Sequence, residues 1–350
     1  MLRKYLLPAE FCFLIFGTYA CGSDHSSTPP PAPTPSVVSF ASGGNYPEGI
    51  GIDKSDNVWI ANRYSNRVAE LSSAGVVLAT FPVGKRPHGL KIDRSGTGNI
   101  WIQNTAGGGP GAPTSCPGAT SGTVTALNSH GALIGTFCTG GDGPQHAQFD
   151  ASGNIWVTNQ GSNTIAELDG GTGALINTFP TGEAPHAVAR DKTGNFWIGN
   201  YYSGTVSVLN SAGAPLATIP QGSVGLQPTG NDIDLSGNLW QSVQSIDHVS
   251  VFAAAPSFAP IRRQAVGMGP RGVTIDAAGN VFVANQESNN VLEFNSSGAL
   301  IAEFKVGACP ENMAIDSSGS VWVTNACSST VSVLKGVATP SAAADNDSNG

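Results

Sequence analysis

Side chains that could carry out chemistry are few in this sequence of 350 residues, and several of them share one position of a repeated motif. Lys, Arg, Asp and Glu make up only 11% of the chain, against about 25% in an average protein. The residue after the proline of each repeat is polar in all seven copies: Glu48, His88, Gln145, His186, Thr229, Arg271 and Glu311. Imidazole and carboxylate groups transfer protons and bind metal ions. This position is therefore the leading candidate for a functional site.

A second group of polar and aromatic residues follows shortly after in several repeats: Arg63, Tyr64, Gln160, Tyr201, Tyr202, Gln286 and Glu287. Aromatic rings beside amides and opposite charges suit a protein or peptide, a glycan or a small polar molecule. From both groups we predict these ligand-binding residues: Glu48, Arg63, His88, Gln145, His186, Tyr201, Tyr202, Arg271 and Glu311. The alternative is that these polar groups only contact water at the ends of their strands and bind no ligand.

A metal ion is an alternative use of the same residues. His88 and His186 lie two repeats apart, and His146 lies one place out of register in the repeat between them. Two imidazoles with Glu48 or Glu311 could hold an ion, but the chain has no short-range metal-binding motif. We predict no cofactor from these residues alone. Signatures of a serine or cysteine nucleophile are also absent from the sequence.

The repeat that positions these residues is about forty residues long. Its template is Pro-x-Gly, an apolar segment, Asp-x-x-Gly-Asn, a Trp-centred segment ending in Asn, and two further short apolar segments. The Asp recurs at intervals of 40, 57, 41, 43, 42 and 40 residues: Asp53, Asp93, Asp150, Asp191, Asp234, Asp276 and Asp316. All six Trp occupy one template position, and Phe282 fills it in the other repeat.

Within each repeat the apolar residues alternate with period two, which predicts four short strands. The 45 Gly and 23 Pro supply the frequent turns. A period of this length with four strands is typical of a β-propeller blade. We predict an all-β fold, a seven-bladed β-propeller over residues 37–336. The last repeat lacks its fourth strand, and residues 37–40 resemble it, so we expect this N-terminal strand to complete the last blade.

The two rims of such a propeller differ. One carries the Asp-x-x-Gly-Asn turns, whose Asp we interpret as turn residues, because each turn has too few carboxylates for a calcium cage. The other, which we call the variable rim, carries the second-to-third loops and the crossovers between blades. An insert at residues 105–121 falls there, as do four Cys. We predict the disulfides Cys116–Cys138 and Cys309–Cys327.

The chain ends are predicted to lie outside the propeller. Residues 1–20 have the features of an export signal, and residues 21–36 form a Ser- and Pro-rich spacer that begins at Cys21, a candidate lipidation site. The tail 337–350 is expected to be disordered. These segments predict export to a bacterial cell envelope, either anchored to the periplasmic or outer surface only through the lipid or secreted, and we expect a monomer. The net charge of −8 without a basic cluster argues against nucleic acid.

Segments such as 87–93 (PHGLKID) and 153–159 (GNIWVTN) resemble the NHL-repeat and virginiamycin B lyase-like propellers. The resemblance covers residues 37–336 and implies a seven-bladed ring. The streptogramin lyases of this group use a His after the Pro as base, a Glu two residues before it, a Glu at the end of the next strand, and magnesium. At those two carboxylate places His88 has Arg86 and Asn104, and His186 has Ala184 and Asn200. We therefore favour a binding scaffold.

The enzymatic alternative is a lyase or lactonase that depends on Mg²⁺ or Ca²⁺ and uses His88 or His186 with Glu48 or Glu311. Calcium lactonase propellers need Glu, Asn and Asp ligands that converge in the channel. An Asn ends the second strand in six repeats: Asn62, Asn104, Asn159, Asn200, Asn285 and Asn325. We interpret these amides as structural caps of the following loop, although they could also contribute to a calcium site.

Overall fold

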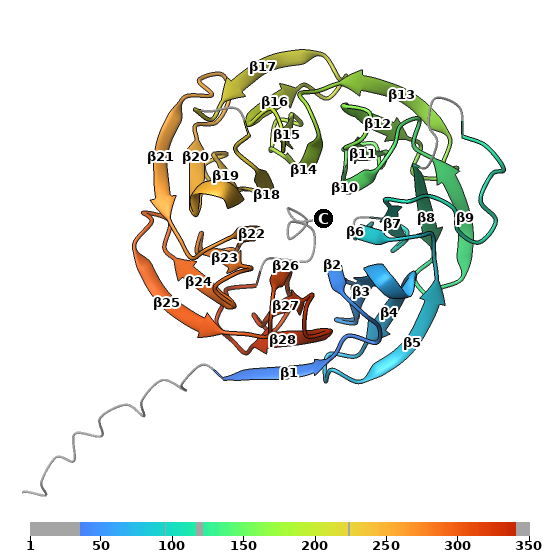
Figure 1. Cartoon of the computed structure of the whole chain (residues 1–350), viewed down its shortest axis with the longest axis horizontal. Helices are drawn as coiled ribbons and strands as arrows, with labels where there is room; N and C mark the ends of the chain where they lie inside the picture. Colours follow the sequence, from blue (N-terminus) through green and yellow to red (C-terminus); the bar gives the residue numbers. More distant parts are fainter. Residues whose placement is uncertain (1–35, 95, 117–121, 223–224, 341–350) are drawn as a thin grey trace, which may run out of the picture. The chain divides into compact units, whose positions relative to one another are not determined.

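Seven four-stranded antiparallel sheets lie in a ring and form a seven-bladed β-propeller, as predicted (Figure 1). The structure is a computed structural model that describes residues 36–94, 96–116, 122–222 and 225–340. The predicted signal, the spacer and Cys21 lie outside these residues. No helix in the described ranges is long and apolar enough to cross a membrane.

In blades 1 to 6 the strands run in sequence order from the centre of the ring to its outside. Blades 1 and 2 contain β2 (Pro47–Ile52), β3 (Val58–Asn62), β4 (Arg67–Leu71), β5 (Val77–Pro82), β6 (Pro87–Ile92), β7 (Ile100–Asn104), β8 (Thr123–Leu127) and β9 (Leu133–Cys138). Blades 3 and 4 contain β10 (Pro144–Phe149), β11 (Ile155–Asn159), β12 (Thr164–Leu168), β13 (Leu175–Pro180), β14 (Pro185–Arg190), β15 (Phe196–Asn200), β16 (Thr205–Leu209) and β17 (Pro215–Pro220).

Blades 5 and 6 contain β18 (Pro228–Ile233), β19 (Leu239–Val243), β20 (His248–Phe252), β21 (Pro260–Ala265), β22 (Pro270–Ile275), β23 (Val281–Asn285), β24 (Asn290–Phe294) and β25 (Leu300–Lys305). Blade 7 contains β26 (Pro310–Ile315), β27 (Val321–Asn325), β28 (Thr330–Leu334) and, as its outermost strand, β1 (Val37–Ala41). Two single 3-10 turns, η1 (Arg63–Ser65) and η2 (Gln244–Ile246), follow β3 and β19.

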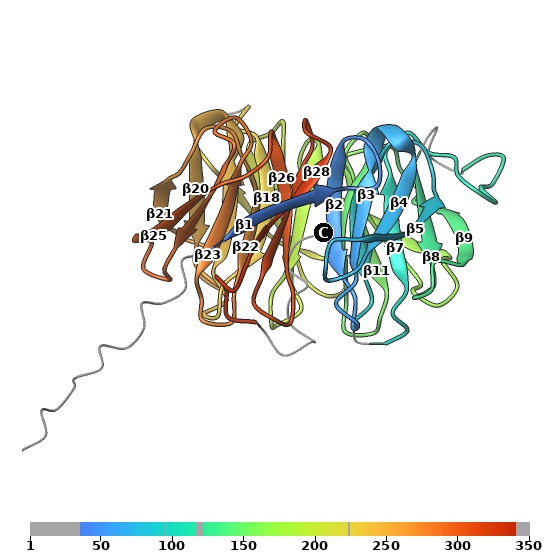
Figure 2. The same ribbon diagram turned by 90° about the horizontal axis from the view of Figure 1, so that it is seen from below.

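The ring is closed by β1, which pairs antiparallel with β28 from Val37 opposite Leu334 to Ala41 opposite Thr330. Figure 2 shows β1 running across the outside of blade 7. The predicted closure by an N-terminal strand is confirmed. It leaves neither end of the ring as an open sheet edge between blades.

The core consists of seven apolar clusters between neighbouring blades; the repeated Trp fills six of them, and Phe282 fills the other. Trp59 is fully buried and packs with Leu90 and Ile100 of blade 2. Its indole Nε1 donates a hydrogen bond to Asp53 Oδ2 at 3.0 Å, and Asp53 Oδ1 accepts backbone N–H groups of its own turn. The same indole–carboxylate bond joins Asp150, Asp191, Asp234 and Asp316 to the Trp six residues later. The template Asp is thus a turn residue, as interpreted, and it also fixes the Trp.

Both predicted disulfides are present. Cys116 and Cys138 are bonded with Cα atoms 5.4 Å apart, and Cys309 and Cys327 with Cα atoms 5.3 Å apart. The first links the insert after β7 to the end of β9, and the second links the crossover before β26 to the loop after β27. Each disulfide therefore ties two loops of the variable rim together.

The prediction that the disordered tail begins at residue 337 is wrong for residues 337–340. Ala338 N donates to the carbonyl of Gly319, and Thr339 N donates to the Asp276 carboxylate at 2.8 Å. Val337 and Ala338 also pack against the cluster between blades 6 and 7. Residues 337–340 thus belong to the propeller, because their few apolar and backbone groups find partners in two neighbouring turns. Residues 341–350 lie outside the described ranges.

Candidate functional site

The seven residues that follow the template Pro all lie at the start of an innermost strand, at the end of the channel that opens on the variable rim. In every blade the pairing register shifts just after this Pro, for example between Pro47 and Ile50. A bulge of this kind re-aims a side chain. Six of the seven side chains are largely buried: Glu48, His88, Gln145, His186, Thr229 and Glu311.

Glu48 and Arg63 form the first charged pair of the site. Arg63 lies in η1, just beyond the strand next to β2, and its Nη1 donates to both carboxylate oxygens of Glu48, at 2.8 and 2.9 Å. Glu48 Oε2 lies 3.7 Å from Nε2 of His88 in the next blade. Burial raises the pKa of Glu48 to about 8, and the neighbouring Arg63 opposes this rise. A carboxyl group with such a pKa can accept or release a proton near neutral pH.

Three imidazoles form a cluster beside Glu48. His88, His146 and His186 come from β6, β10 and β14 of three consecutive blades, and their ring centroids lie 4.9 to 5.3 Å apart. One nitrogen from each ring lies within 4.8 Å of the other two. Burial is the largest cause that holds the pKa of all three below the usual value, to about 3 for His146. The imidazoles are therefore neutral at physiological pH.

His146 reaches this cluster from the position after the ring position, where four other blades have Gly. There a Cβ would come too close to the next blade: on Gly49 it would lie 2.5 Å from the carbonyl oxygen of His88. In blade 3 the His146 N–H instead donates to Thr158 Oγ1, and Thr158 donates to the carbonyl of His186 at 2.7 Å. The sequence showed His146 out of register but did not show that this place faces the same channel.

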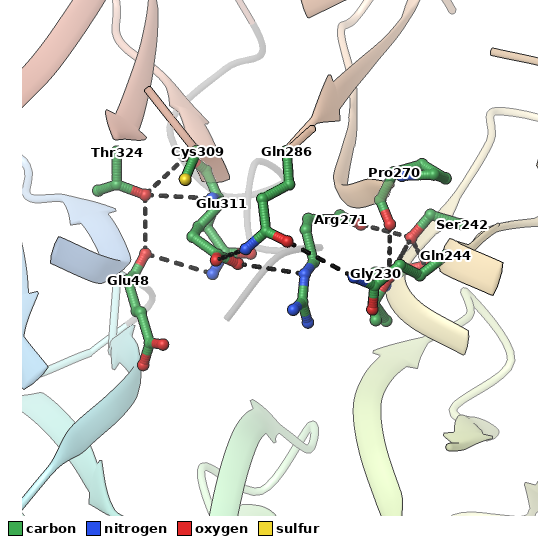
Figure 3. Close-up of polar contacts among 12 residues, drawn as sticks. Glu48, Gly230, Ser242, Gln244, Pro270, Arg271, Gln286, Cys309, Glu311 and Thr324 are labelled. Atoms are coloured by element: carbon green, nitrogen blue, oxygen red, sulfur yellow. Dashed lines mark hydrogen bonds and ion pairs between the residues drawn. The ribbon is translucent and has the colours of Figure 1, made fainter. Parts of the chain in front are cut away.

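A second polar group lies on blades 6 and 7, where Glu311, Arg271 and Gln286 converge (Figure 3). Arg271 Nε lies 3.6 Å from Glu311 Oε2, and the Gln286 amide donates to Oε1 of the same carboxylate. Gln244 of η2 extends this network by a hydrogen bond of 3.5 Å to Gln286. Burial raises the pKa of Glu311, while Arg271 opposes the shift. Blades 6 and 7 thus contribute a cation and a buried carboxylate next to each other, and blade 5 adds the Gln244 amide.

The remaining ring residues, Gln145 and Thr229, are both buried and bond to different partners. Gln145 donates to Gln160 at 2.9 Å, which brings these two predicted neighbours together. The Thr229 hydroxyl instead bonds to the carbonyl of Pro270 and to Ser242, so it links blades 5 and 6. Its polar side chain is explained by this contact.

Two tyrosine pairs flank the channel mouth on the variable rim. Tyr46 and Tyr64 lie with ring centroids 4.7 Å apart on blade 1, and Tyr201 and Tyr202 lie 5.4 Å apart on blade 4. Tyr201 is also 5.9 Å from the ring of His186. Tyr64 and Tyr202 are 60% and 61% exposed. Aromatic surface is therefore available directly beside the buried polar groups.

The strand-end Asn residues do not converge on the channel. All six are fully buried, and each lies under a glycine of the loop that enters its blade. The Asn159 amide, for instance, donates to the carbonyl of Thr139 and to Thr164 within blade 3. The capping interpretation is therefore supported by the contacts. These contacts involve the amide nitrogens, while the six amide oxygens are buried without a hydrogen-bond partner among the described residues, so a contribution of these amides to a calcium site stays a prediction.

A deeper level of the innermost strands carries further polar residues that the motif analysis did not single out. Lys91, Gln148 and Asp232 each lie four residues after the template Pro, and all three are buried. Lys91 lies close enough to contribute to the lowered pKa of His146. The other repeats have Gly, Ala or Thr at this position. The larger polar residues of three repeats were therefore visible in the sequence, but the strand period alone did not show that they face the interior.

Solved structures place this fold among known propellers. Virginiamycin B lyase from Staphylococcus aureus aligns with a TM-score of 0.74 at 14% identity, over 86% of this chain and 99% of the lyase. The chain has the fold of that lyase. A streptogramin B lyase aligns with a TM-score of 0.72 at 15% identity, over 85% of this chain and 97% of the other. The predicted resemblance is confirmed at the level of the fold.

Hydrazine synthase of Kuenenia stuttgartiensis aligns almost as well, with a TM-score of 0.72 at 12% identity over 84% of this chain and 96% of that one. No protein-family model and no curated protein matches the sequence. Proteins with different names share this ring, so the function has to be argued from the side chains at the site.

Proposed function

We propose that this protein is an exported propeller that binds a polar ligand, a glycan or a small polar molecule, at the channel mouth of the variable rim. The observation that carries the proposal is the convergence of buried ionisable groups from separate blades beneath exposed tyrosine rings. Glu48 with Arg63 comes from blade 1, and Glu311 with Arg271 comes from the neighbouring blades 7 and 6. Polar groups that converge beside aromatic rings are a feature of ligand-binding sites, where they fix the orientation of the ligand.

The arrangement fits a ligand that carries both hydroxyl groups and a flat or ring-shaped face. Tyr202 and Tyr64 offer exposed rings for stacking. Arg271 and Gln286 offer donors, and the carboxylates of Glu48 and Glu311 offer acceptors. Hydrogen bonds to charged groups contribute about 1.5 to 3 kcal/mol each, so a few of them would give a small ligand useful affinity.

Export is supported by the two disulfides, because such bonds persist in oxidising compartments. The proposal includes the signal at residues 1–20 and lipidation at Cys21. The disulfides pin loops of the variable rim in blades 2 and 7. A binding face outside the cell would gain stability from these links.

The test is a binding array of defined oligosaccharides and short peptides with the full chain. Tyr202→Ala and Arg271→Ala are expected to weaken binding of any hit at least about tenfold, given the energy of one charged or stacking contact. Leu216→Ala, an exposed change on the outer strand β17, is the matched control. Wild-type binding by both site variants would contradict the proposal.

The second candidate is a metal-dependent lyase or lactonase, with Mg²⁺ or Ca²⁺ as the ion first considered. The contact of 3.7 Å between His88 and Glu48 favours it, because it pairs a possible base with a carboxyl group. Here Glu48 comes from the preceding blade and not from either carboxylate place that the resemblance implies. Incubation of the protein with peptide lactones and each ion, followed by mass spectrometry, tests it. Intact lactone with every ion would exclude this candidate.

A further inference from the structure

We propose that His88, His146 and His186 form a binding site for one divalent transition-metal ion of the zinc type, with a coordination position open toward the channel mouth. This site goes beyond the polar-ligand function, since the ion would bind without any organic ligand. It also differs in ion class from the Mg²⁺ or Ca²⁺ considered above.

The first argument is geometric. One nitrogen from each of the three rings lies within 4.8 Å of the other two. In a tetrahedral zinc site with Zn–N bonds of about 2.05 Å, neighbouring nitrogens lie about 3.4 Å apart. Small rotations of the three side chains would close that gap. The ring planes of His88 stand at 84° and 87° to those of His146 and His186. The rings therefore do not stack on each other and can point nitrogens at a common centre.

The second argument comes from the partners of the individual ring nitrogens. His186 Nδ1 lies 3.0 Å from the carbonyl oxygen of Thr229 and donates to it, which leaves Nε2 with a lone pair. His88 has Nε2 facing the Glu48 carboxylate at 3.7 Å, while its buried Nδ1 has no hydrogen-bond partner among the described residues. Metal-binding imidazoles commonly have one nitrogen on the ion and the other on a carboxylate or a backbone carbonyl. His186 shows this division, and in His88 the nitrogen without a partner lies on the other side of the ring from the one that faces Glu48.

The third argument is burial. His88, His146 and His186 are only 8%, 3% and 6% exposed. The unpaired buried Nδ1 of His88 costs free energy, about 1 to 3 kcal/mol for such a group in proteins, and a metal ion would offset this cost. Burial also keeps the rings neutral, which is the form that binds metal.

The ligand set decides which ion is expected. Imidazole suits zinc, copper, iron and nickel, whereas Mg²⁺ and Ca²⁺ prefer oxygen ligands. Three protein ligands with a fourth open position are typical of catalytic zinc sites. Around the cluster, Glu48 offers a compensating carboxylate, while Arg63, Lys91 and Arg271 are cations nearby. Arg63 is paired with Glu48 and Arg271 lies beside Glu311.

The experiment uses the full chain stripped with a chelator and then titrated with Zn²⁺, Co²⁺, Mg²⁺ or Ca²⁺ alone. We expect one equivalent of Zn²⁺ or Co²⁺ to bind, and a cobalt absorption spectrum of low coordination number. His146→Ala and His186→Ala should each weaken binding at least about 100-fold, since loss of an outer-sphere contact alone costs 10- to 100-fold. His130→Ala and His248→Ala, which change imidazoles outside the cluster, should bind as wild type does.

A measurement on the unaltered protein covers the case in which a variant does not fold. Pulsed electron paramagnetic resonance of the Cu²⁺-loaded chain should detect three coordinated imidazoles. Two or fewer imidazoles, no stoichiometric binding of any of these transition metals, or full binding by the cluster variants would overturn the proposal. Tyr202→Ala should retain the ion, so failure of oligosaccharide binding and failure of metal binding are separate results.

Discussion

The buried imidazole cluster predicts a specific loss of stability in acid. His88, His146 and His186 stay neutral in the folded chain because burial lowers their pKa values, whereas an unfolded His titrates near 6.5. Below about pH 6.5 the unfolded chain therefore binds more protons than the folded one. Linkage then requires that stability is complete above this pH and is lost as the pH falls toward the folded pKa values.

The size of the effect follows from the interval. At pH 5 an unfolded His with a pKa of 6.5 is about 1.5 pH units below its midpoint, which corresponds to about 2 kcal/mol for each imidazole that must stay neutral. The pKa of His146, about 3, keeps that ring neutral at pH 5. His88 and His186 act in the same sense, because burial lowers their pKa values too. Glu48 acts in the opposite sense, because its raised pKa makes the folded chain take up a proton as the pH falls.

The assay is therefore a comparison between variants. Urea unfolding of chelator-treated protein is followed by the fluorescence of the six buried Trp at pH 8 and pH 5. His146→Gln should reduce the loss of stability between these pH values by about 2 kcal/mol relative to wild type. His130→Gln, an exposed residue of the opposite rim, should leave the loss unchanged. If His146→Gln loses as much stability as wild type, the imidazole is not held neutral and the reasoning is refuted.

Three other changes test separate features. Wild type loses stability as the pH rises, because the folded pKa of Glu48, about 8, exceeds the usual value of 4.5. Glu48→Gln should remove this loss, so that relative to wild type the variant gains about 3 kcal/mol of unfolding free energy between pH 5.5 and pH 8. A difference in unfolding free energy between variant and wild type that stays constant with pH in urea titrations would contradict this. Cys327→Ser opens a loop with a sequence separation of 18 and should cost about 3 kcal/mol of unfolding free energy in non-reducing urea titrations; equal midpoints for wild type and variant would show that this disulfide does not hold the blade. Trp197→Phe removes the 3.0 Å bond to Asp191 and should cost about 1 to 3 kcal/mol by calorimetry; an unchanged Tm would mean that the indole only fills space.

The blade architecture could be predicted because the residues that form each blade lie close together in the sequence. Trp at one template position, the Asp-x-x-Gly-Asn turn and the period-two strands act within about forty residues, so one copy supports the interpretation of the next. The disulfides followed from the rim on which each Cys lies. Even so, the Asp–Trp bond was missed, although its spacing of six residues recurs in five blades.

The candidate site was predicted only in part, because it depends on distances across the ring. The sequence placed Glu48 and His88 at the same template position, but not 3.7 Å apart. His146 occupies a place where Gly is common, and only the packing of blade 3 on blade 4 through Thr158 shows which way it faces. The end of the propeller was also misjudged, because the partners of residues 337–340 belong to turns of other repeats.

The pairing of β1 with β28 has a consequence for the order of assembly. The first described strand of the chain reaches its partner only after nearly all the rest has been made, and Ser39 and Ser332, which bond to each other, are 293 residues apart. Contacts of such long range form slowly, because the loop they close is large. A chain that stops before residue 330 would contain six complete blades and no partner for β1. Closure of the ring therefore distinguishes a full-length molecule from a truncated one.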